Sequence, residues 1–389
     1  MKTGTLILLA GILFILLVDV AFYLVARPHR RWVKRLYWGV SCLFALGLLG
    51  YHALMPRLTG GEMYFWAGKG ILLLLLYYVP RGVYLAAIAP FLFFRRRRWT
   101  GRVATIVALL SFLAILHGTT LGRYQYRVEE VKVAIPGLPA AFEGLRVVQL
   151  TDLHLGSLGR GYPGIRLLVE KVNALRPDVV ALTGDIVNNF ATEILPWSDD
   201  LRAISARHGK FAVTGNHDYG DYTCWPSPGA KEANLRDLFR NVEACGFRML
   251  NNASHPLAIG GDTLYICGVE NWRKSPLPSH GDVTGALRGT NGHVVVLLSH
   301  DPVYWREEIT RHPVALTLSG HTHAMQMGFQ AGRYRWSPAK YFFPEYNGLY
   351  ARDGRQLYVS RGVGYLGIPG RVGLRPEITV IQLTNSPAS

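Results

Sequence analysis

Cysteine is scarce in this chain, with 4 residues among 389. Cys42 lies in an apolar stretch, and the three cysteines of the second half cannot all pair with one another. Because these three cannot all pair, the sequence excludes a disulfide framework. The absence of a C-x-x-C pattern argues against a zinc finger. One bridge among Cys224, Cys245 and Cys267 remains open.

Acidic residues are also few: 26 Asp and Glu stand against 42 Lys and Arg, which gives a formal net charge of +16. Residues 1–122 hold 14 Lys and Arg against 2 Asp and Glu, whereas residues 123–389 hold 28 against 24. No basic stripe with interleaved aromatic residues accompanies this charge, so we do not expect nucleic-acid binding. The excess instead indicates membrane topology, with some attraction to anionic lipid.

Long apolar runs fill the first 122 residues. Each reaches the roughly 20 residues needed to cross a bilayer core, and segments such as 6–18 are apolar on every helical face. The sequence therefore predicts a membrane domain at 1–122 with about four transmembrane helices, followed by a soluble domain at 123–389. The predicted spans cover residues 4–26, 36–55, 66–94 and 103–121. Pro80 and Pro90 predict a kink or an early end in the third.

Basic residues gather in two of the short loops between these spans. Because such loops stay on the cytoplasmic side of a membrane, the N-terminus and residues 123–389 are predicted on the opposite side. The loop after the second span has only Arg57, opposed by Glu62. The basic residues are Arg27, Arg30, Arg31, Lys34 and Arg35 after the first span, and Arg95, Arg96, Arg97, Arg98 and Arg102 after the third.

Strand-like and helix-like segments alternate in the soluble part. Apolar residues at helical spacing predict helices at 165–175, around 197–207 and at 235–242, between short apolar runs typical of strands. The later sequence is rich in strands. This order predicts an α/β fold in which two sheets pack together and are flanked by helices.

Side chains that bind metals directly follow five of the apolar runs. Ligands at the C-terminal ends of several strands can converge on one crevice. Nitrogen and oxygen ligands of this kind suit Mn, Fe or Zn better than Ca or Mg. The runs at 147–150, 179–182, 211–213, 294–298 and 315–318 precede, in turn, Asp152 with His154, Asp185, Asn216 with His217 and Asp218, His300, and His321 with His323.

These blocks read D-x-H, G-D, G-N-H-D, H and G-H-x-H, and they resemble the calcineurin-like metallophosphoesterase family over roughly residues 145–384. The resemblance implies an αββα sandwich of two mixed β-sheets and two divalent metal ions, with Mn favoured. It implies a hydroxide between the ions that attacks phosphorus. One ion would be held by Asp152, His154, Asp185 and His323, and the other by Asp185, Asn216, His300 and His321, with Asp185 bridging.

Two further residues carry expectations beside the ligands. The resemblance implies that His217 contacts the phosphate and protonates the leaving oxygen. Asp218 is expected to orient that imidazole and raise its pKa, as a carboxylate partner does. The family often continues G-H-x-H with Gly-Gly-Gln, whereas here Ala324 and Met325 precede Gln326. Side chains therefore replace glycine where the backbone comes close to the site.

The segment 360–377 is similar to the membrane-associated bacterial branch of the family. That branch includes YkuE- and YaeI-type phosphodiesterases and relatives that act on UDP-diacylglucosamine, and it implies the inner membrane of a bacterium. Either Arg361 or Arg371 would hold a phosphate or sugar, or both are structural. The aromatic segments 219–228 and 336–350 either line a lipid-facing entrance or pack as local core.

The favoured hypothesis is a multi-pass membrane enzyme with an extracytoplasmic catalytic domain. It would hydrolyse a phosphoester or pyrophosphate bond in a lipid or cell-envelope substrate. A first alternative is a hydrolase like the UDP-diacylglucosamine pyrophosphatase of the lipid A pathway, which requires a cytoplasmic domain. A second alternative, outside the enzymes, is a membrane sensor that binds a phosphate ligand without turnover.

Overall fold

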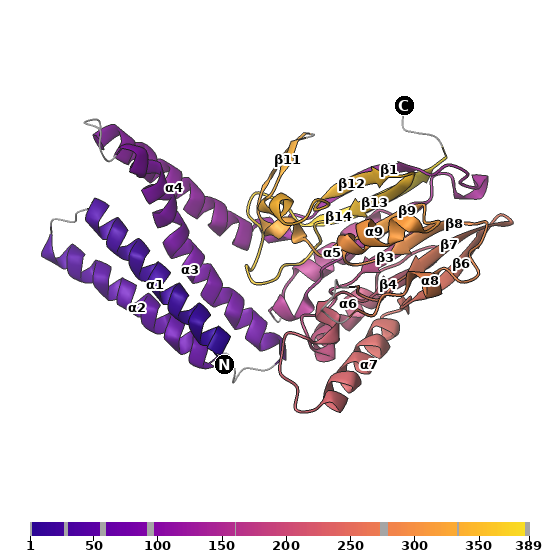
Figure 1. The fold of residues 1–389 in the computed structure, drawn as a ribbon, viewed down its shortest axis with the longest axis horizontal. Coiled ribbons are helices and arrows are strands. Elements are labelled where there is room, and N and C mark those ends of the chain that lie inside the picture. The colour runs from indigo at the N-terminus through magenta and orange to yellow at the C-terminus, as the bar shows by residue number, and fades with distance from the viewer. Residues whose placement is uncertain are drawn as a thin grey trace.

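The computed structural model describes residues 2–26, 30–54, 60–91, 97–159, 161–272, 279–332 and 334–385. Figure 1 shows two parts: a group of N-terminal helices and a layered α/β part that follows them. The predicted loop residues Arg27, Arg57, Arg95 and Arg96 lie outside the described residues.

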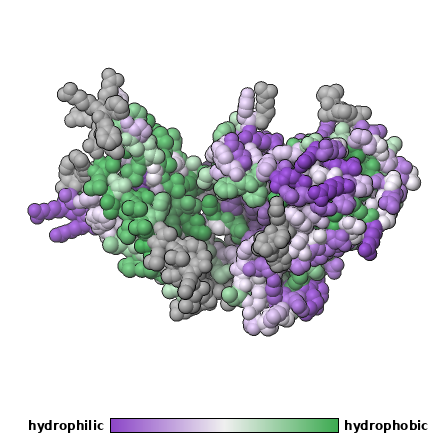
Figure 2. All heavy atoms as spheres, in the orientation of Figure 1, coloured by the Kyte–Doolittle hydropathy of each residue, from purple (hydrophilic) through white to green (hydrophobic). Residues whose placement is uncertain are grey.

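A helix lies in each of the four predicted spans, over the residues that the structure describes. Three segments are long and apolar enough to cross a membrane, namely Arg31–Tyr51, Glu62–Phe91 and Trp99–Tyr124, and a shorter apolar segment covers Gly11–Ala26. Hydrophobic residues dominate the surface of these helices, whereas hydrophilic ones dominate the α/β part (Figure 2). The helices are α1 (Lys2–Ala26), α2 (Arg31–Leu54), α3 (Gly60–Ile88) and α4 (Arg97–Thr120).

Proline shapes only the end of α3. The helix continues through Pro80 and ends at Ile88, where the 3-10 turn η2 (Ala89–Phe91) contains Pro90. A residue that precedes proline is disfavoured in the helical conformation. The early end predicted from Pro90 is therefore confirmed.

One carboxylate is buried among these helices. Asp19 of α1 accepts hydrogen bonds from the hydroxyls of Tyr37 in α2 (3.2 Å) and Tyr78 in α3 (3.1 Å). The Arg81 guanidinium lies 3.7 Å from the same carboxylate. Because a charge among apolar helices is costly unless it is paired, this cluster specifies how the three helices pack.

The α/β part contains two six-stranded sheets. In the first sheet the order is β1-β14-β2-β3-β4-β5, and β14 runs antiparallel to β2 while the other neighbours are parallel. Its strands are β1 (Arg127–Ala134), β2 (Arg146–Leu150), β3 (Val179–Thr183), β4 (Gly209–Val213), β5 (Arg248–Met249) and β14 (Glu377–Thr384).

The second sheet has the order β12-β13-β9-β8-β7-β6, parallel in the centre and antiparallel at both edges. Its strands are β6 (Ala253–Ile259), β7 (Asp262–Gly268), β8 (Val294–Leu298), β9 (Leu316–Ser319), β12 (Gly348–Arg352) and β13 (Arg355–Val359). A separate hairpin pairs β10 (Phe329–Ala331) with β11 (Tyr334–Trp336). The sequence did not predict this hairpin, because three-residue strands carry almost no periodic signal.

Apolar side chains hold the layers together. Val147 and Phe211 of the first sheet pack against Ile266 and Val296 of the second, which makes the core between the sheets. Helices α5 (Gly164–Ala174) and α7 (Pro228–Ala244) cover the outer face of the first sheet, and α8 (Val283–Ala286) and α9 (Pro302–Glu307) cover that of the second. The predicted αββα sandwich is confirmed.

Two predicted helices have different bounds in the structure. The helix expected around 197–207 is a 3-10 segment, η6 (Ala191–Trp197), followed by the short α6 (Ser198–Arg202). The helix expected at 235–242 begins earlier, at Pro228, because the Ser227 side chain accepts a hydrogen bond from the Ala230 amide and caps it. Proline is well tolerated in the first turn that follows such a cap.

The membrane-type helices pack directly against one edge of the sandwich. Helix α3 contacts η5 (Leu155–Ser157) and η6. The Arg371 amide donates to the Gly118 carbonyl of α4 over 3.2 Å. A Cβ added at Gly118 would lie 2.1 Å from the Arg371 carbonyl oxygen, so glycine is what permits this close approach.

We predict that Gly118→Val destabilises the full-length protein by about 1–3 kcal/mol, as overpacking does at tight contacts. Gly101→Val is the matched control, because it lies on the same helix with no atom within 4 Å of an added Cβ. Apparent melting temperatures in detergent test this. Equal melting of the two variants would contradict the packing described for α4.

Candidate metal centre

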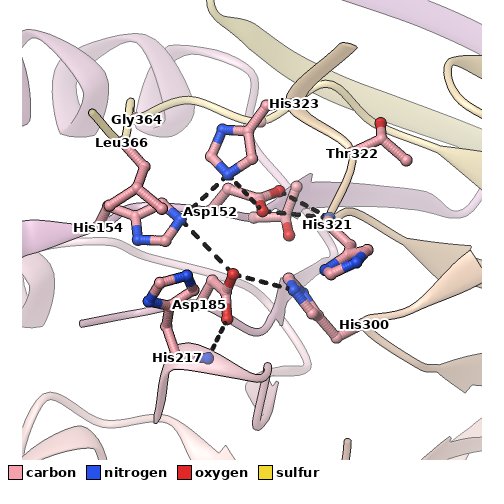
Figure 3. Close-up of polar contacts among 12 residues, drawn as sticks. Asp152, His154, Asp185, His217, His300, His321, Thr322, His323, Gly364 and Leu366 are labelled. Atoms are coloured by element: carbon pink, nitrogen blue, oxygen red, sulfur yellow. Dashed lines mark hydrogen bonds and ion pairs between the residues drawn. The ribbon is translucent and has the colours of Figure 1, made fainter. Parts of the chain in front are cut away.

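The predicted ligands come from the C-terminal ends of five strands. Asp152 and His154 follow β2, Asp185 follows β3, and Asn216 with His217 follows β4 in the first sheet. His300 follows β8 and His321 with His323 follows β9 in the second sheet. Figure 3 shows the aspartate and histidine side chains of this set turned toward one another. The strand ends therefore meet as the sequence predicted.

Two groups of donor atoms meet at one carboxylate. Asp152, His154, Asp185 and His323 offer ligand atoms within 4.8 Å of one another, and so do Asp185, His300 and His321. Asp185 is the member common to both groups. Its Oδ2 lies 3.1 Å from His300 Nε2 and 3.5 Å from His154 Nε2. Each group is suited to hold a divalent metal ion.

Hydrogen bonds fix which nitrogen of each imidazole faces the centre. His300 Nδ1 lies 2.8 Å from the Thr183 carbonyl, which can only accept, so Nδ1 is the protonated nitrogen. His154 Nδ1 lies 2.9 Å from Asn188 Oδ1, which also can only accept, so Nδ1 is protonated in this ring too. In the neutral rings, the Nε2 lone pairs are directed at the Asp185 carboxylate. Lone pairs that face a carboxylate in this way fit a cation between them.

Burial and charge act on these imidazoles in different directions. Burial holds the pKa of His154 well below its ordinary value and lowers that of His321. A neutral imidazole is the form that binds a metal. For His300 burial acts the same way, but the neighbouring Asp185 carboxylate prevails and raises the pKa to about 10. The pocket thus attracts positive charge at His300, which a bound metal ion would supply instead of a proton.

A family model described as calcineurin-like phosphoesterase matches residues 145–325, which carry every ligand block from β2 to η9 (His323–Gln326). Residues 145–325 belong to the calcineurin-like phosphoesterase family. The family relationship agrees with the order of the ligand blocks and with the αββα sandwich.

Two of the similar proteins are named as transmembrane proteins. "Transmembrane protein with metallophosphoesterase domain" of Danio rerio is 31% identical over 294 residues, which cover 72% of this chain and 63% of the relative. The protein of the same name from Bos taurus is 30% identical over 307 residues, covering 75% and 65%. YkuE of Bacillus subtilis is 29% identical over 258 residues, covering 64% and 82%. The chain thus spans less than two thirds of the first two relatives.

Five of the predicted ligands adopt a backbone conformation that L-residues rarely adopt. Left-handed conformations of non-glycine residues cost energy and cluster at functional sites. Gly184, with φ +87°, lies beside them where a Cβ would meet His300 Nδ1 at 2.8 Å. The ligands concerned are Asp152 (φ 55°), His154 (φ 47°), Asp185 (φ 51°), His321 (φ 73°) and His323 (φ 49°).

The segment that departs from the family's Gly-Gly-Gln keeps a glycine-like backbone. Ala324 and Met325 both have φ +48°, and Gln326 has φ +54°. Ala324 is buried, whereas Met325 is 44% exposed. The side chains that replace glycine are therefore accommodated at a cost in backbone strain.

The interpretation of Asp218 is wrong. Its Oδ1 accepts from the amides of Ile186 (2.9 Å) and Val187 (3.1 Å), and its Oδ2 accepts from the Gly215 amide (2.8 Å). The carboxylate therefore ties the loop after β3 to the loop after β4. Sequence proximity to His217 was misleading because the Asp218 carboxylate accepts from three backbone amides instead.

Asn188 takes the role expected of Asp218. Its carbonyl oxygen lies 3.0 Å from His217 Nδ1, and its side chain holds His154. Tyr222 adds a second contact, since its ring stacks on the His217 ring at 4.2 Å. The sequence analysis passed over Asn188, and its position three residues after Asp185 was the one available signal.

Arg361 and Arg371 lie beneath the site. Arg361 is 1% exposed and forms ion pairs of 3.0 Å with Glu129 and Glu377. Arg371 is 2% exposed and donates to the carbonyls of Gly364 (2.8 Å) and His323 (3.0 Å). In this conformation both guanidinium groups hold the protein rather than face a substrate, which corrects the substrate-binding expectation.

We predict that Asn188→Ala lowers the affinity for Mn²⁺ roughly 10- to 100-fold, because the His154 ring loses the acceptor that orients it. Calorimetric titration of chelator-stripped protein measures this affinity. Asn173→Ala is the control, since the Asn173 side chain bonds the Ala203 carbonyl at the exposed surface. Unchanged affinity in Asn188→Ala would show that the amide does not orient the ligand.

A second prediction concerns the left-handed segment. Met325→Gly should raise the free energy of unfolding by about 0.5–1 kcal/mol, because glycine adopts positive φ without strain. Met327→Gly should lower it, since Met327 is extended with φ −140°. Thermal unfolding of the two variants measures the difference, and destabilisation by Met325→Gly would refute the strain.

Proposed function

We propose that this protein is a membrane-embedded phosphoesterase with a two-ion metal centre, acting on a phosphoester or pyrophosphate carried by a lipid. The observation that supports it most is the Asp185 carboxylate, which belongs to both donor groups. Two cations joined by a shared carboxylate are typical of hydrolytic two-metal sites.

The donor set suggests how two ions divide between the groups. Asp152, His154 and His323 would bind one ion and His300, His321 and Asn216 the other, with Asp185 common to both. When bound, the ions neutralise charge on the phosphoryl oxygens and lower the pKa of a water molecule. Among Mn, Fe and Zn, which suit these ligands, we favour Mn.

His217 is placed to serve the leaving group. Its Nδ1 donates to the Asn188 carbonyl, which leaves Nε2 as the nitrogen available to a substrate. Its ring centroid lies 4.9 Å from that of His154. A protonated Nε2 next to the ligands would contact a phosphate oxygen and give its proton to the leaving oxygen.

The position of the membrane-type helices favours a lipid substrate. Helix α3 contacts η5 and η6, which follow the ligand-bearing strands β2 and β3. Tyr64 of α3 accepts a hydrogen bond from the Asn189 side chain, one residue from the amide that holds His154. Gly118 of α4 bonds Arg371, whose side chain bonds His323. A bilayer around these helices would therefore lie close to the metal centre.

Exposed aromatic side chains on the same rim support this placement. Tyr341 and Phe342 are 69% and 70% exposed, so these two do not form the local core that was one reading of the segment 336–350. Phe343, which follows them, reaches the His321 ring at 5.7 Å. Aromatic rings at this position suit contact with the lipid interface.

Basic residues support one side of the membrane in this proposal. We place the helices in a bacterial inner membrane with the catalytic domain outside the cytoplasm, because Arg30 precedes α2 and Arg31, Lys34 and Arg35 lie at its N-terminal end. Basic residues at such positions stay on the cytoplasmic side. This side disfavours the UDP-diacylglucosamine alternative, whose substrate is expected in the cytoplasm.

We predict Mn²⁺-dependent release of p-nitrophenol from bis-p-nitrophenyl phosphate or p-nitrophenyl phosphate by the full-length protein in detergent. Asp185→Asn should reduce the rate to background, since both donor groups lose a charge. His217→Ala should lower it roughly 10²–10⁴-fold, the usual contribution of a general acid. The comparison of the two substrates gives the ester preference.

The control is Asp301→Asn, which lies next to His300 but caps α9 by accepting from the Val303 amide at 2.8 Å. Asparagine caps helices as well as aspartate does, so this variant should keep its rate. A protein that binds Mn²⁺ yet hydrolyses neither compound, in detergent or in lipid, would instead be the sensor.

A further inference from the structure

Two cavities meet along one face of α3. The first, of about 770 Å³, lies between α3 and the catalytic domain and is bordered by η5 and η6. The second, of about 800 Å³, lies between α2 and α3. Trp66 and Lys69 line both, so the two cavities adjoin at these residues. Their sizes match those of ordinary ligand sites.

The cavity between α2 and α3 is apolar. Leu43, Phe44 and Leu48 line it from α2, and Ile71 and Leu74 line it from α3. It belongs to the two helices whose segments Arg31–Tyr51 and Glu62–Phe91 are apolar enough to cross a membrane. A hydrocarbon chain is the occupant that such a lining stabilises, because it removes apolar surface from water.

The junction cavity has a different chemistry. Lys69 and Arg123 bring positive charge to it, while Glu62 and Glu193 bring negative charge, and the Glu62 side chain is exposed to solvent. The Lys69 ammonium lies over the Phe65 ring, 5.3 Å from the ring centroid. The carboxylate of Glu193, which also borders this cavity, accepts from the Asn188 and Phe190 amides. Its negative charge is thus partly satisfied by the protein, and Lys69 remains available to an anion.

Hydrogen bonds connect the wall of the junction cavity to the metal centre. Leu155 and Gly156, which line it, directly follow the ligand His154. Glu193 in its wall bonds the Asn188 amide, and the Asn188 side chain holds His154. The apolar groove is thus followed by the Lys69 ammonium and then by the residues that hold the metal ligand His154.

We infer that the two cavities together bind one lipid phosphate, with an acyl chain in the groove between α2 and α3 and the phosphate beside Lys69 in the junction cavity. This inference rests on the proposed function, because it names the class of substrate that the metal centre would receive. A neutral lipid headgroup would leave the ammonium without a counter-charge, so the site favours an anionic one.

The test uses full-length protein in nanodiscs and phosphatidic acid with a photoreactive diazirine in the middle of its acyl chain. After illumination, mass spectrometry maps the labelled peptides. The expected labels lie on residues 43–51 of α2 and 71–74 of α3. A diazirine-bearing phosphatidylcholine provides the comparison for headgroup charge.

Glycines of α2 provide a matched pair of variants. An added Cβ at Gly47 or at Gly39 has no atom within 4 Å, so a larger side chain fits at both, but only Gly47 lines the groove. Gly47→Phe should lower labelling at least fivefold, and Gly39→Phe should leave it unchanged. Equal labelling of these two variants, or labels spread over all four helices, would overturn the inference.

Substitution of Lys69 tests the phosphate end. Lys69→Gln should reduce the preference for phosphatidic acid over phosphatidylcholine about fivefold, the effect of one basic residue near anionic lipid. Lys69→Arg should preserve that preference. Equal labelling of the wild type by both lipids would refute a site for an anionic headgroup at Lys69.

Hydrolysis of bis-p-nitrophenyl phosphate in the same preparations separates the two proposals. This small ester does not need the groove, so Gly47→Phe should keep its rate. Hydrolysis without the expected labelling would reject the lipid site and keep the phosphoesterase. The expected labelling in protein that hydrolyses no phosphoester would keep the lipid site and reject the proposed function.

Discussion

The arrangement of the metal centre depends on the buried carboxylate of Asp185. The Nε2 atoms of His154 and His300 face this carboxylate, and their Nδ1 atoms are already committed to oxygen acceptors. In a buried site such interactions are stronger than in water. A cation bound between them would interact favourably with both the imidazole lone pairs and the carboxylate. Its binding would also offset the backbone strain of the five ligands in left-handed conformations.

Much of this arrangement followed from the sequence, for an identifiable reason. Each ligand block stands after an apolar strand, and parallel strands deliver their C-terminal ends to one edge. The positions of Asp152, Asp185 and His300 were therefore predictable from local pattern. The sandwich followed from the alternation of strands and helices, whereas the bounds of the helices near 197 and 228 differed and the hairpin of β10 and β11 was not predicted.

The remaining features depend on contacts between distant residues. Asp218 was expected to bond its neighbour His217. Two of its three hydrogen bonds instead come from amides more than 30 residues earlier in the chain. Asn188 has no motif of its own, because an amide that orients an imidazole can come from any loop of suitable shape. The contact of Tyr64 with Asn189 joins residues 125 positions apart. No periodicity records a contact of this kind.

Arg371 connects helix α4 to the metal centre. The Gly118 carbonyl holds the Arg371 amide, and the Arg371 side chain holds the carbonyl of His323. A spanning helix changes its tilt to match the thickness of the bilayer around it. Only one residue, Arg371, separates α4 from the backbone of a predicted ligand. In the membrane that we propose, bilayer thickness would therefore act on the geometry of the metal centre, and lipid composition would become a variable of its chemistry.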